Sequence, residues 1–86
     1  MLKVAVSMKK STFTKQYALL LYALKQARLE AGLTQTEVGR KFGSHASFVS
    51  KCESGERRID VIELTLFCKL YGVSIFDFLK RIPLGQ

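Results

Sequence analysis

The sequence predicts an all-α fold, a compact domain of five helices preceded by a basic leader. Three observations lead to this prediction. Apolar residues recur three and four positions apart through the body of the chain, the spacing of one helix face. Residues that cap helix N-termini stand before three of these segments, at Thr34, Asp60 and Ser74. Glycines follow the segments where helices commonly end, and no alternating pattern typical of strands occurs in the body.

Length, charge and cysteine content limit the possible functions. With 86 residues, the chain has room for one domain with a modest core. The net charge of +7 fits a polyanionic partner, although residues 1–15 hold four lysines and no acid. No apolar run approaches the ~20 residues that span a bilayer, so we expect a cytoplasmic protein without a membrane partner. Cys52 and Cys68 lie in apolar helical patterns, which predicts two reduced, buried cysteines rather than a disulfide or a metal site.

The chain divides into a basic leader, a folded domain and a short tail. We expect the leader to cover residues 1–13 and to be partly flexible, the domain to cover residues 14–83, and the tail to cover residues 84–86.

The first helix is expected from about Thr14 to Ala31, with Gly32 as its stop. Its first half is apolar on every side, and such a helix requires burial on every side. Leu19 and Tyr22 fall off the main apolar stripe. Either the leader or a second subunit is expected to cover them, and we favour a second subunit.

A second helix is expected after Thr34, which forms a capping box with Glu37. Val38 and Phe42 are four residues apart and therefore lie on one face of this helix. Gly43 then stands where the chain must turn sharply, because glycine adopts the left-handed conformation at little cost.

A third helix is expected over residues 45–54, with Ser44 or His45 as its cap and Gly55 as its stop. Val49 and Cys52 are three apart on its inner side. Two short helices joined by a tight glycine turn form a helix-turn-helix unit, whose second helix can lie in a DNA major groove.

Two further helices complete the predicted domain. Asp60 and Glu63 resemble a second capping box, and the helix that they open ends at Gly72. Ser74 caps a short and very apolar last helix, which we expect to run on through Ile82 until Pro83 ends it.

Three segments together carry a family resemblance: LTQ at 33–35, FGSHASFVSKCESGERR at 42–58 and YGVSIFDFL at 71–79. With them, residues 18–80 resemble the lambda-repressor-like (Cro/cI, XRE-type) helix-turn-helix domain. Proteins of this family are mostly bacterial and phage transcriptional regulators, usually repressors that bind operator DNA as dimers. The resemblance therefore implies a sequence-specific double-stranded DNA-binding transcriptional regulator, expected to be a homodimer and a repressor.

The resemblance also implies roles for individual residues. Base contacts from the outward face of the third helix are expected from Ala46, Ser47, Ser50 and Lys51. Contacts to DNA phosphates are expected from Gln35, His45, Ser54, Arg57 and Arg58. Arg28 of the first helix and Glu53 of the third match a structural ion pair, which would explain an arginine on an apolar stripe. A dimer interface is expected from Leu19, Tyr22, Phe76, Phe78 and Ile82.

Other functions remain open on the same fold, namely a protein-interaction module, an antitoxin or a restriction-modification controller. Acidic or bulky apolar residues on the outward face of the third helix would favour an interaction module, and that face has neither. An enzyme is not expected, because the chain has one histidine, no acidic pair on a shared face and no glycine-rich phosphate loop. We expect no cofactor, no metal and no small-molecule effector.

Overall fold

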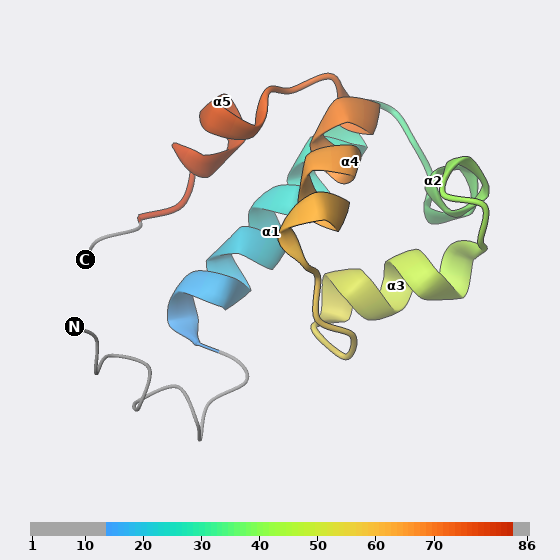
Figure 1. The fold of residues 1–86 in the computed structure, drawn as a ribbon, viewed down its shortest axis with the longest axis horizontal. Coiled ribbons are helices and arrows are strands. Elements are labelled where there is room, and N and C mark those ends of the chain that lie inside the picture. Colours follow the sequence, from blue (N-terminus) through green and yellow to red (C-terminus); the bar gives the residue numbers. More distant parts are fainter. Residues whose placement is uncertain (1–13, 84–86) are drawn as a thin grey trace.

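The computed structural model describes residues 14–83, which form five helices and no strand. The predicted basic leader, residues 1–13, and the tail, residues 84–86, lie outside the described part. In chain order the helices are α1 (Lys15–Glu30), α2 (Gln35–Lys41), α3 (Ala46–Ser54), α4 (Val61–Tyr71) and α5 (Ile75–Leu79). The all-α, five-helix prediction is therefore confirmed. The helix α1 packs against α3 and α4, α2 packs on α3, and α5 packs on α4 (Figure 1).

The helix starts follow the capping residues of the sequence. The side chains of Thr34 and Asp60 each accept a hydrogen bond from the backbone three residues on, at 3.1 Å and 2.8 Å. The carboxylates of Glu37 and Glu63 each accept a hydrogen bond from the backbone N–H of the cap residue, so both capping boxes are complete. Thr14 caps α1 rather than belonging to it. Two free N–H groups of each boxed helix are thereby satisfied within the chain.

The last helix is shorter than expected. It ends at Leu79, and Lys80 is its C-cap. Ile82 therefore lies in a turn beyond the helix, where its N–H donates to the carbonyl of Leu79 at 3.1 Å. The expectation that the helix continues to Pro83 is wrong, because this turn already redirects the chain.

All five helices contribute side chains to the core. Its fully buried side chains are Leu24, Val38, Val49, Cys52, Phe67, Cys68 and Phe78. Both cysteines are free and buried, as predicted, and burial raises the pKa of each thiol. None of the helices in the described range is long and apolar enough to cross a membrane.

The predicted dimer surface divides into buried and exposed residues. Phe78 is 0% exposed and Ile82 is 4% exposed, so both belong to the core and offer no surface to a partner. This part of the prediction is corrected: the small core needs large apolar side chains from its last helix and from the turn after it. Leu19, Tyr22 and Phe76 do lie on the surface, with exposed fractions of 38%, 65% and 76%.

Candidate nucleic-acid interface

The turn between α2 and α3 is tight. Gly43 has a φ of 73°, in the left-handed region, and its N–H donates to the carbonyl of Arg40 at 2.9 Å. The N–H of Ser44 reaches back to the carbonyl of Gly39 at 2.8 Å. These two bonds satisfy carbonyls at the end of α2, and the chain enters α3 directly. The predicted role of Gly43 is confirmed.

A second glycine, which was not predicted as a site residue, brings the two helices together. Gly39 is buried inside α2, and a Cβ there would lie 2.4 Å from the carbonyl carbon of His45 and 2.5 Å from its oxygen. Because real side chains do not approach backbone so closely, only glycine fits this position. A glycine inside a short helix was the available signal, since it costs helix stability unless packing requires it.

The helix α3 has one buried and one exposed side. Val49 and Cys52 are 0% exposed and face the core. The four residues predicted to contact bases lie on the other side: Ser47, Ser50 and Lys51 are exposed and Ala46 is partly exposed. The structure therefore brings the predicted reading residues to one accessible face. No acid lies in the first turn of α3 to repel a phosphate.

Arg28 and Glu53 form the predicted ion pair, buried between α1 and α3. The Nε of Arg28 donates to Oε2 of Glu53 at 2.7 Å, and Nη2 donates to Oε1 at 3.2 Å. Arg28 Nη1 donates to the carbonyl of Leu33 at 2.9 Å. The side chains are only 7% and 5% exposed. The hydrogen bond to Glu53 raises the pKa of Arg28, although burial opposes the shift.

Gln35 belongs to the same network. Its Nε2 donates to Oε1 of Glu53 at 3.0 Å. The prediction for Gln35 is a contact to a phosphate, and this bond to Glu53 is an additional role. A glutamine amide has two N–H donors, so the bond to Glu53 leaves one for DNA. Glu53 thus joins α1, the start of α2 and the end of α3, and we call Arg28, Gln35 and Glu53 the buried clamp.

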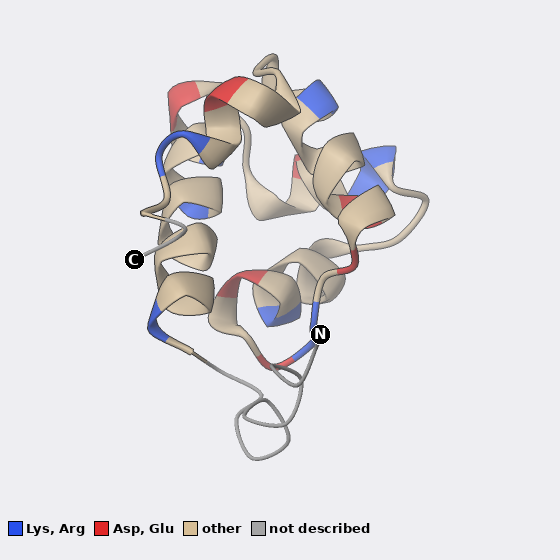
Figure 2. Ribbon diagram, turned by 60° about the vertical axis from the view of Figure 1, so that its left-hand side comes forward, with Lys and Arg blue, Asp and Glu red and all other residues tan. Residues whose placement is uncertain are grey.

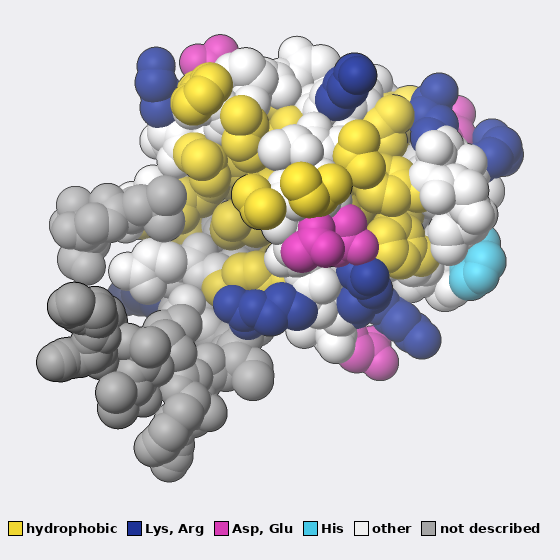
Figure 3. Space-filling model, in the orientation of Figure 1, with side chains coloured by type: hydrophobic (Ala, Val, Ile, Leu, Met, Phe, Trp, Pro, Cys, Tyr) yellow, Lys and Arg dark blue, Asp and Glu magenta, His cyan; other side chains and the backbone are white. Residues whose placement is uncertain are grey.

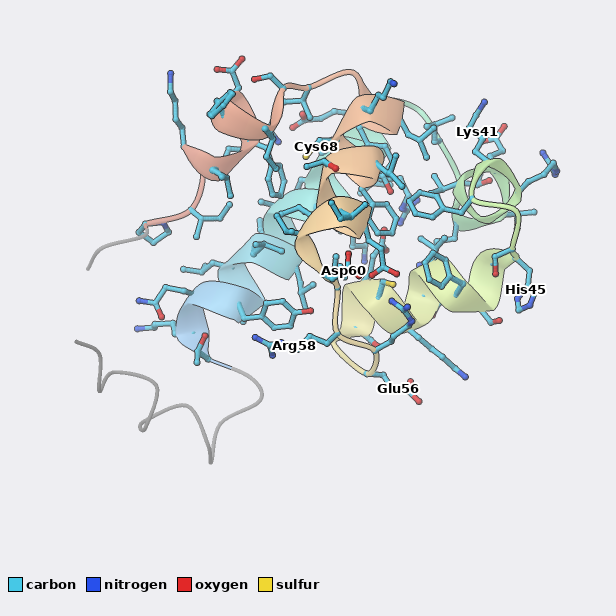
Figure 4. The ribbon with its side chains drawn as sticks, in the orientation of Figure 1. Lys41, His45, Glu56, Arg58, Asp60 and Cys68 are labelled. Atoms are coloured by element: carbon cyan, nitrogen blue, oxygen red, sulfur yellow. The ribbon has the colours of Figure 1, made fainter. Side chains whose placement is uncertain are left out.

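His45 occupies the N-cap position of α3 without capping it through its side chain. Its Nδ1 lies 2.7 Å from the hydroxyl oxygen of Ser47, and both side chains are exposed. Figure 4 shows His45 projecting at the outer end of α3, away from the core. The two polar groups stand side by side at the N-terminus of the helix.

The two arginines of the loop after α3 make contacts within the protein. Arg57, expected at a phosphate, makes a two-pronged pair with Glu63 of α4, at 3.0 Å and 2.8 Å. Its guanidinium also lies 5.0 Å from the ring centre of Phe48. The pairing raises the pKa of Arg57 and lowers the pKa of Glu63. Arg58 is exposed and lies 4.3 Å above the ring of Tyr17.

Ser54 also bonds within the protein. Its hydroxyl donates to the carbonyl of Lys51 at 3.1 Å and accepts the N–H of Glu56 at 3.3 Å. The hydroxyl therefore helps to end α3. Over the described residues, acidic and basic positions are spread over several helices (Figure 2). Lys51 is the lysine that the outward face of α3 contributes.

Phe48 is partly buried and packs against the rings of other aromatic residues. Its ring lies 5.4 Å from that of Phe42 and 6.3 Å from that of Phe67. Together with the close approach at Gly39, this aromatic cluster joins α2, α3 and α4. This packing fixes the inner side of α3 against the core and leaves its outward face accessible.

Comparison with known proteins agrees with this geometry. The sequence model of the helix-turn-helix family matches residues 24–78, which is well over half of the chain. No curated protein matches the chain significantly. The match begins within α1 and ends within α5, so it covers the buried clamp and the turn at Gly43. The chain belongs to the DNA-binding helix-turn-helix family of regulators, of the lambda-repressor-like (XRE) type.

Proposed function

We propose that this protein is a sequence-specific transcriptional repressor that reads the major groove of double-stranded DNA with α3. The observation that carries the proposal is the two-sided character of α3. Its inner side is anchored by Val49 and Cys52, which are fully buried, and its outer side presents Ala46, Ser47, Ser50 and Lys51. A rigid helix with an accessible outer face is what insertion into a groove requires.

The side chains on this face define how bases would be read. Lys51 can donate to the O6 and N7 acceptors of guanine, and serine hydroxyls can serve several base edges. The methyl group of Ala46 can contact a thymine methyl. Such small side chains offer few direct contacts, so we propose that DNA shape contributes part of the specificity.

Phosphate contacts would place α3 in register with the groove. The N-terminus of α2 has free N–H groups, and the side-chain amide of Gln35 has a second N–H that can donate to a phosphate. His45 and Ser54 lie at the two ends of α3, Arg58 lies in the loop that follows, and all three are exposed. Arg57 is held by Glu63, so we propose that it supplies positive charge near the backbone rather than a dedicated bond.

We further propose a cytoplasmic homodimer on DNA. Leu19, Tyr22 and Phe76 are large apolar side chains exposed on α1 and α5. Two-fold symmetry would double the DNA contacts and space two half-sites about one helical turn apart. A lower mass of Phe76→Ala than of wild type, measured by light scattering, would support a dimer interface at this surface. An unchanged dimer mass in Phe76→Ala and Tyr22→Ala would contradict it.

Fluorescence anisotropy tests DNA reading directly. The ligand is the DNA upstream of the protein's own gene, compared with a scrambled duplex over a salt series. Wild type is compared with Lys51→Ala and with Lys25→Ala, which changes an exposed lysine of α1. We expect only Lys51→Ala to lose about 1–3 kcal/mol of preference for the promoter duplex.

The other outcomes are equally informative. If Lys51→Ala weakens both duplexes equally and lowers the salt slope by about one, Lys51 contacts phosphate and does not read a base. If the folded wild-type protein binds neither duplex at low salt, the proposal is wrong and a protein-interaction module becomes the better explanation.

A further inference from the structure

An open hollow of about 310 Å³ lies between the end of α2 and the outer side of α4. Its lining is Lys41, Phe42, Leu66, Lys69 and Leu70. The ring of Phe42 forms part of the floor and lies 4.5 Å from the ring of Phe67, which is fully buried. The floor is therefore attached to the core and has a fixed shape.

The apolar surface extends beyond the hollow along α4. Ile62, Leu66 and Leu70 are spaced by four residues and so follow one side of the helix. Ile62 is 65% exposed and Leu66 is 46% exposed. This strip is about 12 Å long, because each helical residue advances about 1.5 Å. A continuous apolar strip that ends in a hollow is typical of a site for a partner.

Basic side chains border this surface. Lys41 and Lys69 line the hollow, and Arg40 is exposed on α2 next to Lys41. None of the three has an ion-pair partner among residues 14–83. No acidic residue lines the hollow. Figure 3 shows the apolar surface at the upper right of this face, with basic side chains along its upper and right edges and acidic side chains at its lower left edge. Figure 4 shows Lys41 at the end of α2.

We propose that this hollow and strip bind an acidic amphipathic helix of another protein. Its large apolar side chains, spaced by three and four, would enter the hollow and follow the strip on α4. Its carboxylates would pair with Lys41 and Lys69, whose positions exclude a basic partner by repulsion. The open shape suits a helix laid along the surface better than an enclosed small molecule.

Two other occupants fit the surface less well. A second copy of the chain offers α5 as an exposed apolar segment, but its one carboxylate, Asp77, already pairs with Lys80 at 3.8 Å. The phosphates of DNA could pair with the two lysines but would make no contact with the apolar side chains of the hollow. The hollow also lies at the end of α2 opposite Gln35, so a partner bound there leaves α3 accessible.

The experiment uses a fluorescein-labelled peptide of roughly 12 residues, about two or three helical turns, with leucines at helical spacing and glutamates elsewhere. A control peptide carries lysines in place of the glutamates. Both are titrated onto the full ¹⁵N-labelled protein, and binding is followed by anisotropy and by amide chemical shifts. We expect saturable shifts from the acidic peptide, concentrated at Phe42, Leu66 and Leu70, and none from the basic peptide.

Variants then connect the binding to the proposed residues. We expect Lys69→Glu and Leu66→Ala each to weaken peptide binding at least about tenfold, because a charge is reversed or an apolar contact is lost. Lys25→Glu, on α1, serves as the charge-matched control and is expected to bind as wild type does. All three proteins are expected to keep their helical circular dichroism and their DNA affinity.

Three results would overturn the proposal. The first is shifts that do not saturate or that spread over the whole protein. The second is equal binding of the acidic and the basic peptide. The third is a wild-type dimer that Leu66→Ala dissociates, which would show that a second copy covers the hollow.

Discussion

Two arginine–glutamate pairs, each held by two hydrogen bonds, differ in exposure. Arg28 and Glu53 bond at 2.7 Å and 3.2 Å with side chains 7% and 5% exposed. Arg57 and Glu63 bond at 3.0 Å and 2.8 Å with side chains 44% and 20% exposed. The first pair joins α1 to α3, and the second joins the loop after α3 to the start of α4.

Because of this difference in exposure, we expect the Arg28–Glu53 pair to contribute more to stability than the Arg57–Glu63 pair. Both charges of the buried pair have lost their water, so removing one partner leaves the other charge buried and unpaired. Water and salt still reach the exposed pair, and its members can be solvated when they separate. The buried pair therefore determines whether α3 stays in position, whereas the exposed pair adjusts the loop beside it.

The largest expected effect comes from breaking the buried pair. Glu53→Ala leaves the guanidinium of Arg28 without its carboxylate and is expected to lower the free energy of unfolding by about 3–5 kcal/mol. Urea denaturation followed by circular dichroism measures the loss, with Glu56→Ala as the exposed control. Adding Arg28→Met to Glu53→Leu should restore much of the stability, since no charge then stays buried. A loss below about 1 kcal/mol in Glu53→Ala would show that the pair is not needed.

The second effect tests whether the buried pair is the only device that holds α3. Gly39→Ala would force its methyl group into the backbone of His45, and we expect a loss of about 1–3 kcal/mol in unfolding free energy. The sign of the change in unfolding free energy distinguishes the two possibilities, because helix propensity alone would make the alanine variant more stable by about 1 kcal/mol. A more stable Gly39→Ala protein in the same urea assay would show that α2 and α3 can separate freely.

A smaller effect is expected at the edge of the buried clamp. Gln35→Ala removes one hydrogen bond to Glu53 but leaves the ion pair intact, so the unfolding free energy should fall by about 1 kcal/mol. Thr36→Ala, an exposed neighbour in α2, is the matched control. A loss as large as that of Glu53→Ala would mean that the ion pair depends on Gln35.

The smallest effect belongs to the exposed pair and depends on pH. Because Arg57 lowers the pKa of Glu63, the pair's contribution is complete above the unfolded pKa of about 4.3 and disappears as the pH falls through the lower folded value. Wild type should therefore exceed Arg57→Ala in stability near neutral pH. We expect this pair-dependent difference to decrease in acid and in high salt. A difference that is insensitive to both would indicate that the contact of Arg57 with Phe48 dominates.

The same contrast explains which site residues could be predicted. The outer face of α3 was predictable, because residues three and four apart share a helix side whatever the rest of the chain does. Arg28 and Glu53 were predicted from a family resemblance, since periodicity alone shows only an arginine on an apolar stripe. The partner of Arg57 was not predictable, because several acids lie within reach of a loop arginine and only packing selects Glu63.

The sequence by itself determined the number of helices, their starts at Thr34 and Asp60 and the turn at Gly43. These features depend on bonds within about four residues, which the local sequence specifies. Tertiary structure alone decided that Phe78 is buried and Phe76 is 76% exposed, that Gly39 touches the backbone of His45 and that Gln35 bonds Glu53. Each of these depends on how separate helices pack, and no local pattern encodes that arrangement.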